Sequence, residues 1–563
     1  MFMKLRRIVV LFTVLSLLAV LFAGCGNGDT NNTGTNNTNT GTPAPGNTGS
    51  NTPAPSDTGS GTQAGPERSR TVNLGVGYRP TTMDPNDIRN WSSVVHAAFN
   101  FETLMHTEHT ASGYKPRLAE SWEINDNGTV WTFHLRKDVT FHNGDPFTAD
   151  DVVCTVERVV SREDLVYKMY YAPTMVGAEK VDDYTVKISF SQPNPDGNAA
   201  FTSLYIIPKN AYEELGDDLF HLQYSYGTGP WVLDEWIDGQ NSRFHKNENY
   251  WGKDEYDSYF NEVVLHYISE PSSAIAAHLS GTIDAYAANG GVSMDLVSLY
   301  NGTEDRIELI RYETCTNYNM TLSFKEGSPW LDNNLRRAFD LSLDRQMIID
   351  TIFGGSGATA PVGASHKAMI GYDESLGNPE FNPELAKQLV TESSYDGRPI
   401  ELMIHNTLVQ GEEVALAIAD MAKAVGINMV VTMEEFAVFT TRQNEGQYDL
   451  NIVSVSSTDG TPYRALEQII DNYNKPEVKN WDKAEELYAL IRETIGEKGM
   501  DRERRAGYAQ QINKFLFENS GPQIRLIYRN MTQAQNKGIT GIDYWPDGLL
   551  NFSRVNWDPT LAP

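Results

Sequence analysis

The carboxyl-terminal half of this chain predicts an α/β fold with a partly parallel sheet. Helical patterns cover residues 333–352, 383–392, 412–425 and 483–495, and strand-like runs cover residues 400–405, 427–432 and 450–455. Helices that alternate with strands are typical of this class, because each helix carries the chain back to begin a parallel strand. The chain has 563 residues, which is enough for more than one domain.

The amino-terminal half predicts strands and hairpins around fewer helices. An alternating strand at 72–77 is followed by a loop at 78–90, a helix at 91–104 and paired strands at 122–124 and 130–135. Asn127-Gly128 lies between the paired strands, and this dipeptide supplies the positive φ values of a tight primed turn. Residues 148–151 resemble a capping box at the start of a helix that runs to residue 160.

The next elements follow the same logic up to the middle of the chain. Residues 181–190 predict a strand pair with its turn at Asp182-Asp183, and Gly227-Thr228-Gly229-Pro230 predicts a sharp break. Further elements are a strand-rich stretch at 231–266, a helix at 272–280 and an extended segment at 307–324.

Residues 1–24 have the pattern of a secretory signal peptide. Three basic residues within positions 4–7 precede an almost wholly apolar run at 8–23, which is too short to cross about 30 Å of hydrocarbon comfortably. Leu21-Phe22-Ala23-Gly24-Cys25 resembles the bacterial lipobox, whose cysteine is lipidated and becomes the mature amino terminus. We therefore expect a lipoprotein anchored through Cys25 to the outer face of the cell membrane, or on its periplasmic side.

Residues 25–66 predict a disordered tether after the lipidated cysteine. From residue 26 onwards the segment is rich in Asn, Thr, Gly, Ser and Pro, and its only apolar side chains are alanines. Such a composition buries too little apolar surface to offset the entropy of ordering the chain. The folded body should therefore stay near a membrane but turn freely.

Charge and cysteine content narrow the function classes. The formal net charge is −29, and an acidic surface should repel nucleic acid and anionic lipid. Besides Cys25, the chain has only Cys154 and Cys315. We predict two buried thiols, with a disulfide between them as the alternative that export permits. No paired-cysteine metal pattern is present, and we expect a monomer without a cofactor.

A series of motifs in fixed order resembles the signature of family 5 bacterial extracellular solute-binding proteins. The motifs are Leu118-Ala119-Glu120-Ser121-Trp122, 131–136, 141–152, 227–230, Asn249-Tyr250-Trp251, 335–338, Asp344-Arg345, Ala386-Lys387, Gly426-Ile427 and Tyr448-Asp449. The resemblance covers roughly residues 71–557. Most of the motif residues make turns, fill the core or cap a helix, so the signature indicates a scaffold rather than a cargo.

The resemblance implies a two-lobed α/β fold like that of periplasmic binding proteins, with a hinged cleft between the lobes. One lobe comprises residues 71–311, with a subdomain inserted at about 91–224, and residues 541–563 return to it. The other lobe comprises residues 312–540. Because a ligand contacts both lobes only when they close, binding shifts the population toward a closed shape that an importer recognises.

By this resemblance, the chain is the substrate-binding protein of an ABC importer that takes up peptides or other amine-bearing solutes and delivers them to a membrane permease. A surface peptide sensor or a chaperone-like binder is the alternative of another class. Neither class is an enzyme. No Gly-x-Ser-x-Gly elbow, phosphate loop or dinucleotide motif occurs, and the paired histidines at 106 and 109 lack an indicated third metal ligand.

Two alignments of one stretch leave the ligand open. In the peptide-binding branch, an Asp after a Tyr/Phe-Asp-Leu strand pairs with the ligand's α-ammonium, and Asp459 can take that place although Ser456 replaces the usual Trp. In the nickel and metallophore branch, a Gly-x-Pro-Tyr motif occurs, and residues 460–463 match it. Here, however, Arg464-Ala465-Leu466 replaces the Asp-Pro-His that often follows.

Other predicted ligand contacts rest on their position in the chain. Arg89, Asn90 and Trp91 lie in the loop after the first strand, where family members often contact the ligand. Thr458 and Tyr463 flank the Asp459 loop, and Arg464 can bind a carboxylate through its planar guanidinium. The alternative is a core role for Trp91, a turn role for Asp459 and a solvated Arg464. We predict no catalytic residue and no metal ligand.

Overall fold

The computed structural model describes residues 69–88, 91–107, 114–170, 173–194, 200–220, 226–287, 291–456, 476–494, 500–545, 548 and 550–562. Residues Arg68–Pro563 form one compact unit. Within the described part of the chain, no helix has the length and apolar character needed to cross a membrane.

Strands and helices alternate along the described chain. The strands are β1 (Thr71–Val76), β2 (Met105–Thr107), β3 (Tyr114–Pro116), β4 (Ala119–Ile124), β5 (Val130–Leu135), β6 (Met175–Asp182), β7 (Thr185–Phe190), β8 (Trp231–Ile237), β9 (Asn241–Lys246), β10 (Glu262–Tyr267), β11 (Ala285–Ala287), β12 (Ile307–Leu322), β13 (Ala358–Thr359), β14 (Ile400–His405), β15 (Met429–Glu434), β16 (Leu450–Val455), β17 (Gln523–Asn536), β18 (Ile539–Thr540), β19 (Asp543–Tyr544), β20 (Leu550–Asn551) and β21 (Asn556–Trp557). The α-helices are α2 (Trp91–Asn100), α3 (Ala149–Ser161), α4 (Val166–Tyr170), α6 (Lys209–Leu215), α7 (Pro271–Leu279), α8 (Met294–Val297), α9 (Asn333–Ser342), α10 (Arg345–Thr351), α11 (Pro383–Glu392), α12 (Gly411–Ala424), α13 (Phe436–Asn444), α15 (Pro476–Lys479), α16 (Ala484–Arg492) and α18 (Arg502–Asn519).

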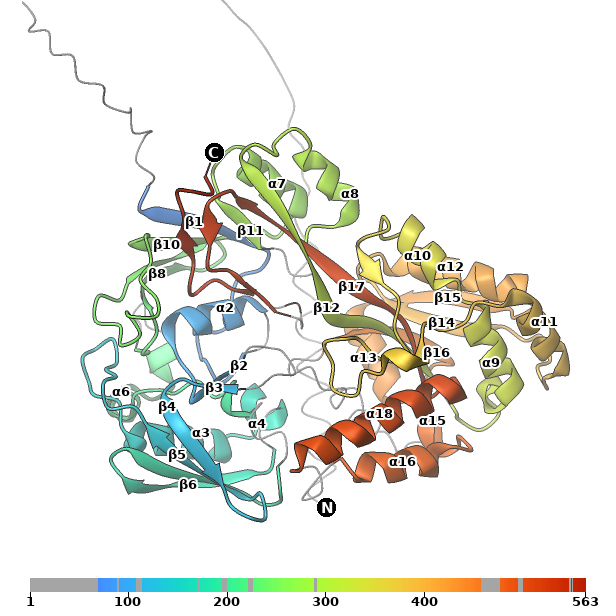
Figure 1. Cartoon of the computed structure of the whole chain (residues 1–563), viewed down its shortest axis with the longest axis horizontal. Coiled ribbons are helices and arrows are strands. Elements are labelled where there is room, and N and C mark those ends of the chain that lie inside the picture. The colour runs from blue at the N-terminus through green and yellow to red at the C-terminus, as the bar shows by residue number, and fades with distance from the viewer. Residues whose placement is uncertain are drawn as a thin grey trace, which may run out of the picture. The chain divides into compact units, whose positions relative to one another are not determined.

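One large mixed sheet runs through the described chain, in the order β15-β14-β16-β12-β17-β11-β1-β10-β9-β8 with β13 beside β17. The long strands β12 and β17 are antiparallel and pair from one part of the sheet to the other, as the olive and red strands in Figure 1 show. We call β15, β14 and β16 the carboxyl-terminal half-sheet, and β11, β1, β10, β9 and β8 the amino-terminal half-sheet. The mixed α/β fold agrees with the predicted fold class, and β12 and β17 lie between the two half-sheets.

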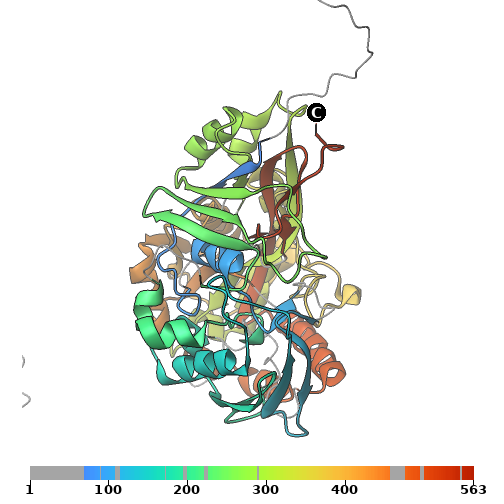
Figure 2. The ribbon, with the colours of Figure 1, turned by 90° about the vertical axis from the view of Figure 1, so that its left-hand side faces the viewer.

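A separate four-stranded sheet, β4-β5-β7-β6, packs against α3. Its core includes Trp131, Phe133 and Phe201, all with no exposed surface. In Figure 2 its blue-green strands lie below the green strands of the large sheet. The capping box predicted for α3 is confirmed, because Thr148 and Asp151 cap each other's backbone N–H groups as expected.

Several predicted elements are confirmed residue by residue, and others need correction. β14, β16 and α11 have the predicted bounds. The helix predicted at 333–352 is two helices, because Asp344 accepts a hydrogen bond from the Met347 N–H at 2.8 Å and starts α10 as a new helix. The helix predicted at 91–104 ends at Asn100.

The turn predicted at Asn127-Gly128 is also different from expectation. Of the two residues, only Gly128 has a positive φ, at 70°. The Gly128 N–H donates to the Asn125 carbonyl at 2.9 Å, so a longer turn precedes the glycine instead of a two-residue primed turn. Gly128 supplies the left-handed conformation, as glycine does most readily.

Both predicted thiols are free. Cys315 on β12 is fully buried, as expected, whereas Cys154 on α3 is only half-buried. Burial, together with the nearby acidic groups of Asp151 and Glu213, raises the pKa of Cys154 to about 11, so this thiol stays protonated and unreactive at neutral pH.

Candidate functional site

The carboxyl-terminal half-sheet has a topological switch point. β14 pairs in parallel with β15 on one side and with β16 on the other. The chain leaves β14 through α12 to reach β15, then returns through α13 to reach β16. The two helices pack on opposite faces, α12 with Leu402 and α13 with Met403. In open α/β sheets, ligands bind outside the carboxyl ends of the strands at such a point.

The carboxyl ends of β14 and β16 therefore define the candidate site. β16 ends at Val455, whose carbonyl accepts a hydrogen bond from Asn317 Nδ2 of β12 at 3.1 Å. The next residue, Ser456, accepts a hydrogen bond from the Thr316 hydroxyl at 3.2 Å. These contacts fix the point at which the chain leaves the sheet.

β12 changes register at this point. Between Glu313 and Asn317 its pairing with β17 is irregular, as in a bulge. Thr314, in the same interval, donates its hydroxyl to the Arg529 carbonyl of β17 at 2.7 Å. A bulge re-aims side chains locally, so β12 directs Thr314 toward β17 and Thr316 toward Ser456.

A strained residue lies beside the carboxyl end of β14. Gln410 precedes α12 and has a φ of 54°, a left-handed conformation that non-glycine residues adopt at a cost. Its side chain donates to the Ile352 carbonyl at 2.6 Å, and the neighbouring Val409 carbonyl accepts a hydrogen bond from the Tyr318 hydroxyl. The loop after β14 is therefore fixed to β12 and to the end of α10.

A loop around His366 covers the other side of the β12 bulge. His366 Nδ1 accepts a hydrogen bond from the Ala368 N–H at 3.2 Å and lies 3.8 Å from the Cys315 sulfur. Its Nε2 lies 3.7 Å from Glu313, which also forms an ion pair with Lys367. Burial lowers the pKa of His366, and the Lys367 charge adds to this effect while Glu313 opposes it.

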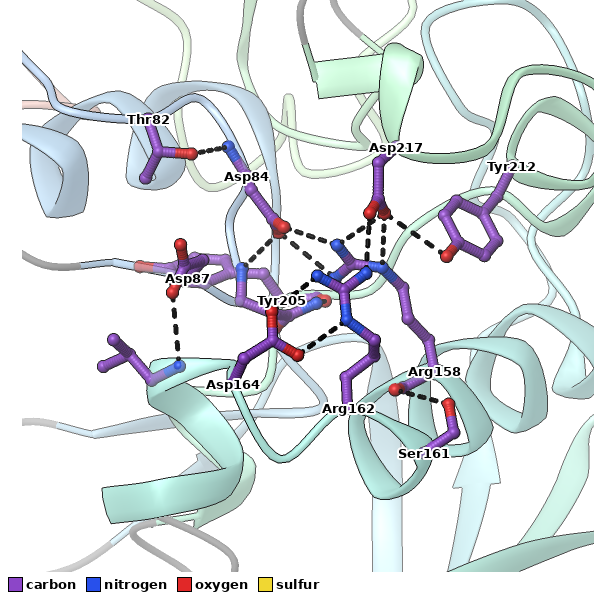
Figure 3. A network of polar contacts seen from close by, with 12 residues as sticks. Thr82, Asp84, Asp87, Arg158, Ser161, Arg162, Asp164, Tyr205, Tyr212 and Asp217 are labelled. Atoms are coloured by element: carbon purple, nitrogen blue, oxygen red, sulfur yellow. Dashed lines mark hydrogen bonds and ion pairs between the residues drawn. The ribbon is translucent and has the colours of Figure 1, made fainter. Parts of the chain in front are cut away.

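A network of charged residues anchors the loop that leads to Arg89, Asn90 and Trp91 (Figure 3). Asp84 of this loop accepts two hydrogen bonds from Arg158 of α3, one of them at 3.2 Å. Arg158 also reaches Asp217 at 3.0 Å, and Arg162 pairs with Asp217 at 2.6 Å. Burial works against the charge of Asp217, but the two arginines outweigh it and lower its pKa.

None of the predicted ligand contacts has a described side chain. Arg89, Asn90, Thr458, Asp459, Tyr463 and Arg464 lie outside the described residues, as does the lipidation candidate Cys25. Trp91 is the first residue of α2, but its side chain is not described. The structure does describe the points from which these segments depart, which are Ser456 at the end of β16 and the loop held by Asp84.

The predicted structural role of the sequence signature is confirmed by the surroundings of Glu102. This carboxylate is 4% exposed and accepts hydrogen bonds from Thr228 at 2.9 Å, Tyr250 at 2.9 Å and Trp251 at 2.7 Å. It also forms an ion pair with Arg117 at 2.6 Å. Two signature motifs thus meet on one buried carboxylate of a distant segment.

The glycines of the 227–230 motif are required by close backbone approach. A Cβ atom on Gly227 would lie 1.7 Å from the Asn100 carbonyl oxygen, and one on Gly229 would lie 2.4 Å from that of Phe99. No side chain fits there, so both positions demand glycine for packing and not for ligand binding.

Comparisons with known proteins identify the family. The model of "Bacterial extracellular solute-binding proteins, family 5 Middle" matches residues 113–477, more than half of the chain. The chain therefore belongs to the family 5 bacterial extracellular solute-binding proteins. This family consists of transport binding proteins and not of enzymes.

Individual relatives match over most of their length. Heme-binding protein A of Haemophilus influenzae is 26% identical, covering 87% of this chain and 91% of that protein. The periplasmic oligopeptide-binding protein OppA of the same species is 27% identical, covering 68% and 75%. The crystal structure of NikA from Brucella suis in complex with Fe(III)-EDTA has a TM-score of 0.77 at 20% identity, covering 87% of this chain and all of that one.

Sequence reasoning missed residues that the structure brings to the switch point. Thr316, Gln410 and His366 lie in three segments far apart in sequence, and no motif marks them. Buried Arg525 on β17 was missed as well. The signal available for it was a charged residue within the otherwise apolar run at 524–528.

Proposed function

We propose that this chain is the substrate-binding lipoprotein of an ABC importer, which captures a peptide or similar amine-bearing solute between its lobes and delivers it to a membrane permease. The observation that carries the proposal is the switch point at the carboxyl ends of β14 and β16. Ser456, which begins the segment containing Asp459, is held at that point by Thr316. The oligopeptide-binding name of one relative supports the peptide class.

In this proposal, each predicted contact has a role. The Asp459 carboxylate pairs with the solute's ammonium group, and hydrogen bonds to charged groups contribute about 1.5–3 kcal/mol each. Thr458, Tyr463 and Arg464 line the same loop. Arg89, Asn90 and Trp91 approach from the other lobe on the segment anchored by Asp84, so their contacts form only on closure.

The lobe limits are part of the proposal. One lobe comprises residues 71–311 with its inserted subdomain at about 91–224 and the returning segment 541–563, and the other comprises residues 312–540. The antiparallel pairing of β12 with β17 supports a hinge in these two strands. A single pair of strands between two sheet halves bends more readily than a packed interface.

The first experiment identifies the solute. Native mass spectrometry of the purified protein detects what copurifies, and a thermal-shift panel compares tripeptides with nickel, nickel chelates and hemin. A bound solute raises the melting temperature by mass action. Stabilisation by a metal chelate or hemin, without any response to peptides, would refute the peptide class.

The second experiment tests the amine anchor. Asp459→Asn should weaken the affinity for a free-amine tripeptide by about tenfold or more, because the ammonium loses its charged partner. Asp396→Asn is the matched control, since Asp396 is exposed and accepts a hydrogen bond from the Arg398 N–H of its own loop. Equal affinities for both variants by calorimetry would remove Asp459 from the site.

The membrane anchor has its own test. Cys25→Ser should release the protein from the membrane fraction, whereas the wild type should carry a lipid on its amino-terminal cysteine by mass spectrometry. A membrane-bound, unlipidated wild type would contradict the lipoprotein assignment.

A further inference from the structure

The two faces of the carboxyl-terminal half-sheet differ in chemistry. On one face, Met320 of β12, Ile452 of β16 and Ile524 of β17 enter one apolar core. Side chains alternate between faces along a strand, so the residues next to these three face the other way. On that second face lie Asn319 and Arg525, which are neighbours in register across β12 and β17.

Asn319 and Asn451 are buried polar side chains without partners. Both have no exposed surface, and neither the side-chain nitrogen nor the side-chain oxygen of either residue forms a hydrogen bond within the structure described. Asn451 pairs with Thr321, two residues along β12 from Asn319, so the two amides lie on the same face within reach of one small ligand. Buried amides are normally hydrogen-bonded, and such a pair indicates a missing polar partner.

Arg525 adds a positive charge to this face. Its side chain is 5% exposed, and it donates from one terminal nitrogen to Gln523 Oε1 at 3.2 Å, while its Nε has no partner. Burial lowers the pKa of Arg525, opposed only by neighbouring Tyr528. Among the described residues, no carboxylate pairs with Arg525.

Two buried arginines elsewhere in the described chain pair with acids: Arg158 with Asp84 and Asp217, and Arg345 with Asp340 at 2.6 Å. The partly buried Arg117 pairs with Glu102. Arginine does not lose its proton in proteins, so an unpaired buried guanidinium calls for an anion.

The position of this group relates it to the switch point. Asn317 pairs with Val455 at the carboxyl end of β16, and Asn319 lies two residues farther into the sheet. Two residues of strand span about 7 Å, which is the reach of one or two ligand residues.

We propose that Arg525, Asn319 and Asn451 form a buried carboxylate-binding site, filled by an acidic group of the captured solute. The guanidinium supplies the charge, and the two amide groups supply further hydrogen-bond donors. This inference rests on the proposed function, because it names the second group of the same solute. A small free carboxylate has the same chemistry and is distinguished by the experiment.

The experiment measures the binding of trialanine and of trialanine amide by calorimetry. The wild type should prefer the free acid by about tenfold or more, and Arg525→Met should bind both equally. Arg525→Lys, which keeps the charge, should retain part of the preference. Arg337→Met alters an exposed arginine of α9 outside the site and should keep the preference. A preference that survives in R525M would overturn the proposal.

Small anions separate this inference from the proposed function. Sodium formate, compared with sodium chloride at equal ionic strength, should raise the melting temperature of the wild type but not of R525M. Equal shifts in both proteins would overturn the site whether or not peptides bind. A formate effect confined to the wild type, with acid and amide peptides bound equally, would show that a free anion and not the solute fills the site, which also contradicts the proposal. Failure of all peptides to bind would refute the proposed peptide function while the formate comparison still tests Arg525.

Discussion

Arg158 and Arg525 are both buried arginines, yet their surroundings differ in charge. Arg158 and Arg162, beside the small sheet, face the carboxylates of Asp84, Asp217 and Asp164 (Figure 3). Arg525, beside the carboxyl-terminal half-sheet, has only neutral Gln523 and Tyr528 as described partners. In the first region the protein's own carboxylates balance the arginine charges, whereas in the second region an added anion is needed to balance Arg525. The difference teaches that similar burial of the same side chain can serve the scaffold in one place and a ligand in another.

The largest expected effect on stability comes from removing the buried guanidinium of Arg158. Arg158→Met should lower the free energy of unfolding by about 3–5 kcal/mol, because it leaves Asp84 buried without its partner. Urea denaturation measures the change. Arg162→Met is the matched control, since its guanidinium is partly exposed, and it should cost far less. Equal losses for the two variants would contradict a special role for burial.

A change of opposite sign in the free energy of unfolding is expected when Arg525 is removed. Arg525→Met should raise the free energy of unfolding of the solute-free protein by up to about 3 kcal/mol, because it removes a buried charge without a carboxylate partner. The same urea titration measures it. A strongly destabilised R525M, with no added anion, would show that Gln523 and Tyr528 suffice to hold the guanidinium.

Mild acid should destabilise the protein through His278, which is buried and neutral at pH 7. His278 has no exposed surface, and burial lowers its pKa from 6.5 to about 4. The unfolded chain binds the proton first, so stability is present above pH 6.5 and falls as the pH drops toward 4. Between pH 7 and pH 5 the loss is about 2 kcal/mol for this residue. His278→Gln should remove that share of the pH dependence, and an unchanged slope would assign the acid sensitivity to other groups.

The smallest expected effects distinguish two threonines of β12, one that stabilises the fold and one that holds the candidate site. Thr314→Val removes a hydroxyl that bonds the Arg529 carbonyl, and should cost about 1 kcal/mol of stability without changing solute affinity. Thr316→Val releases Ser456 and should weaken solute binding several-fold with little effect on melting. Thr316→Ser should restore binding. The same change in affinity for both valine variants would show that the β12 bulge acts as one unit.

Local elements of the fold could be predicted because their signals are local. β14 and β16 have apolar runs of strand length, α11 begins with Asn382 and Pro383, and Thr148 with Asp151 marks the start of α3. α18 and β17 were not predicted. The signal for α18 was present but overlooked, because Ala509, Ile512 and Leu516 recur at helical spacing among many polar residues. β17 mixes polar and apolar residues because its two faces meet different surroundings.

The candidate site could be predicted only as far as its motifs extend in sequence. The stretch from Thr458 to Arg464 was found through a family resemblance, and it stays a prediction. Thr316, His366 and Arg525 could not be assigned to a site from sequence, because their meaning depends on strands and loops that are far apart along the chain.

The sequence by itself determined the α/β class, the family and the structural role of its signature, since periodicity, turn residues and collinear motifs are properties of the chain order. Only the tertiary structure decided that the glycines at 227 and 229 face the backbone of α2. It also decided that, among the residues described, Arg525 lies beside two asparagines without hydrogen-bond partners and has no carboxylate partner. The reason is physical: whether a buried charge is balanced depends on which distant side chains surround it, and the order of residues along the chain does not state that.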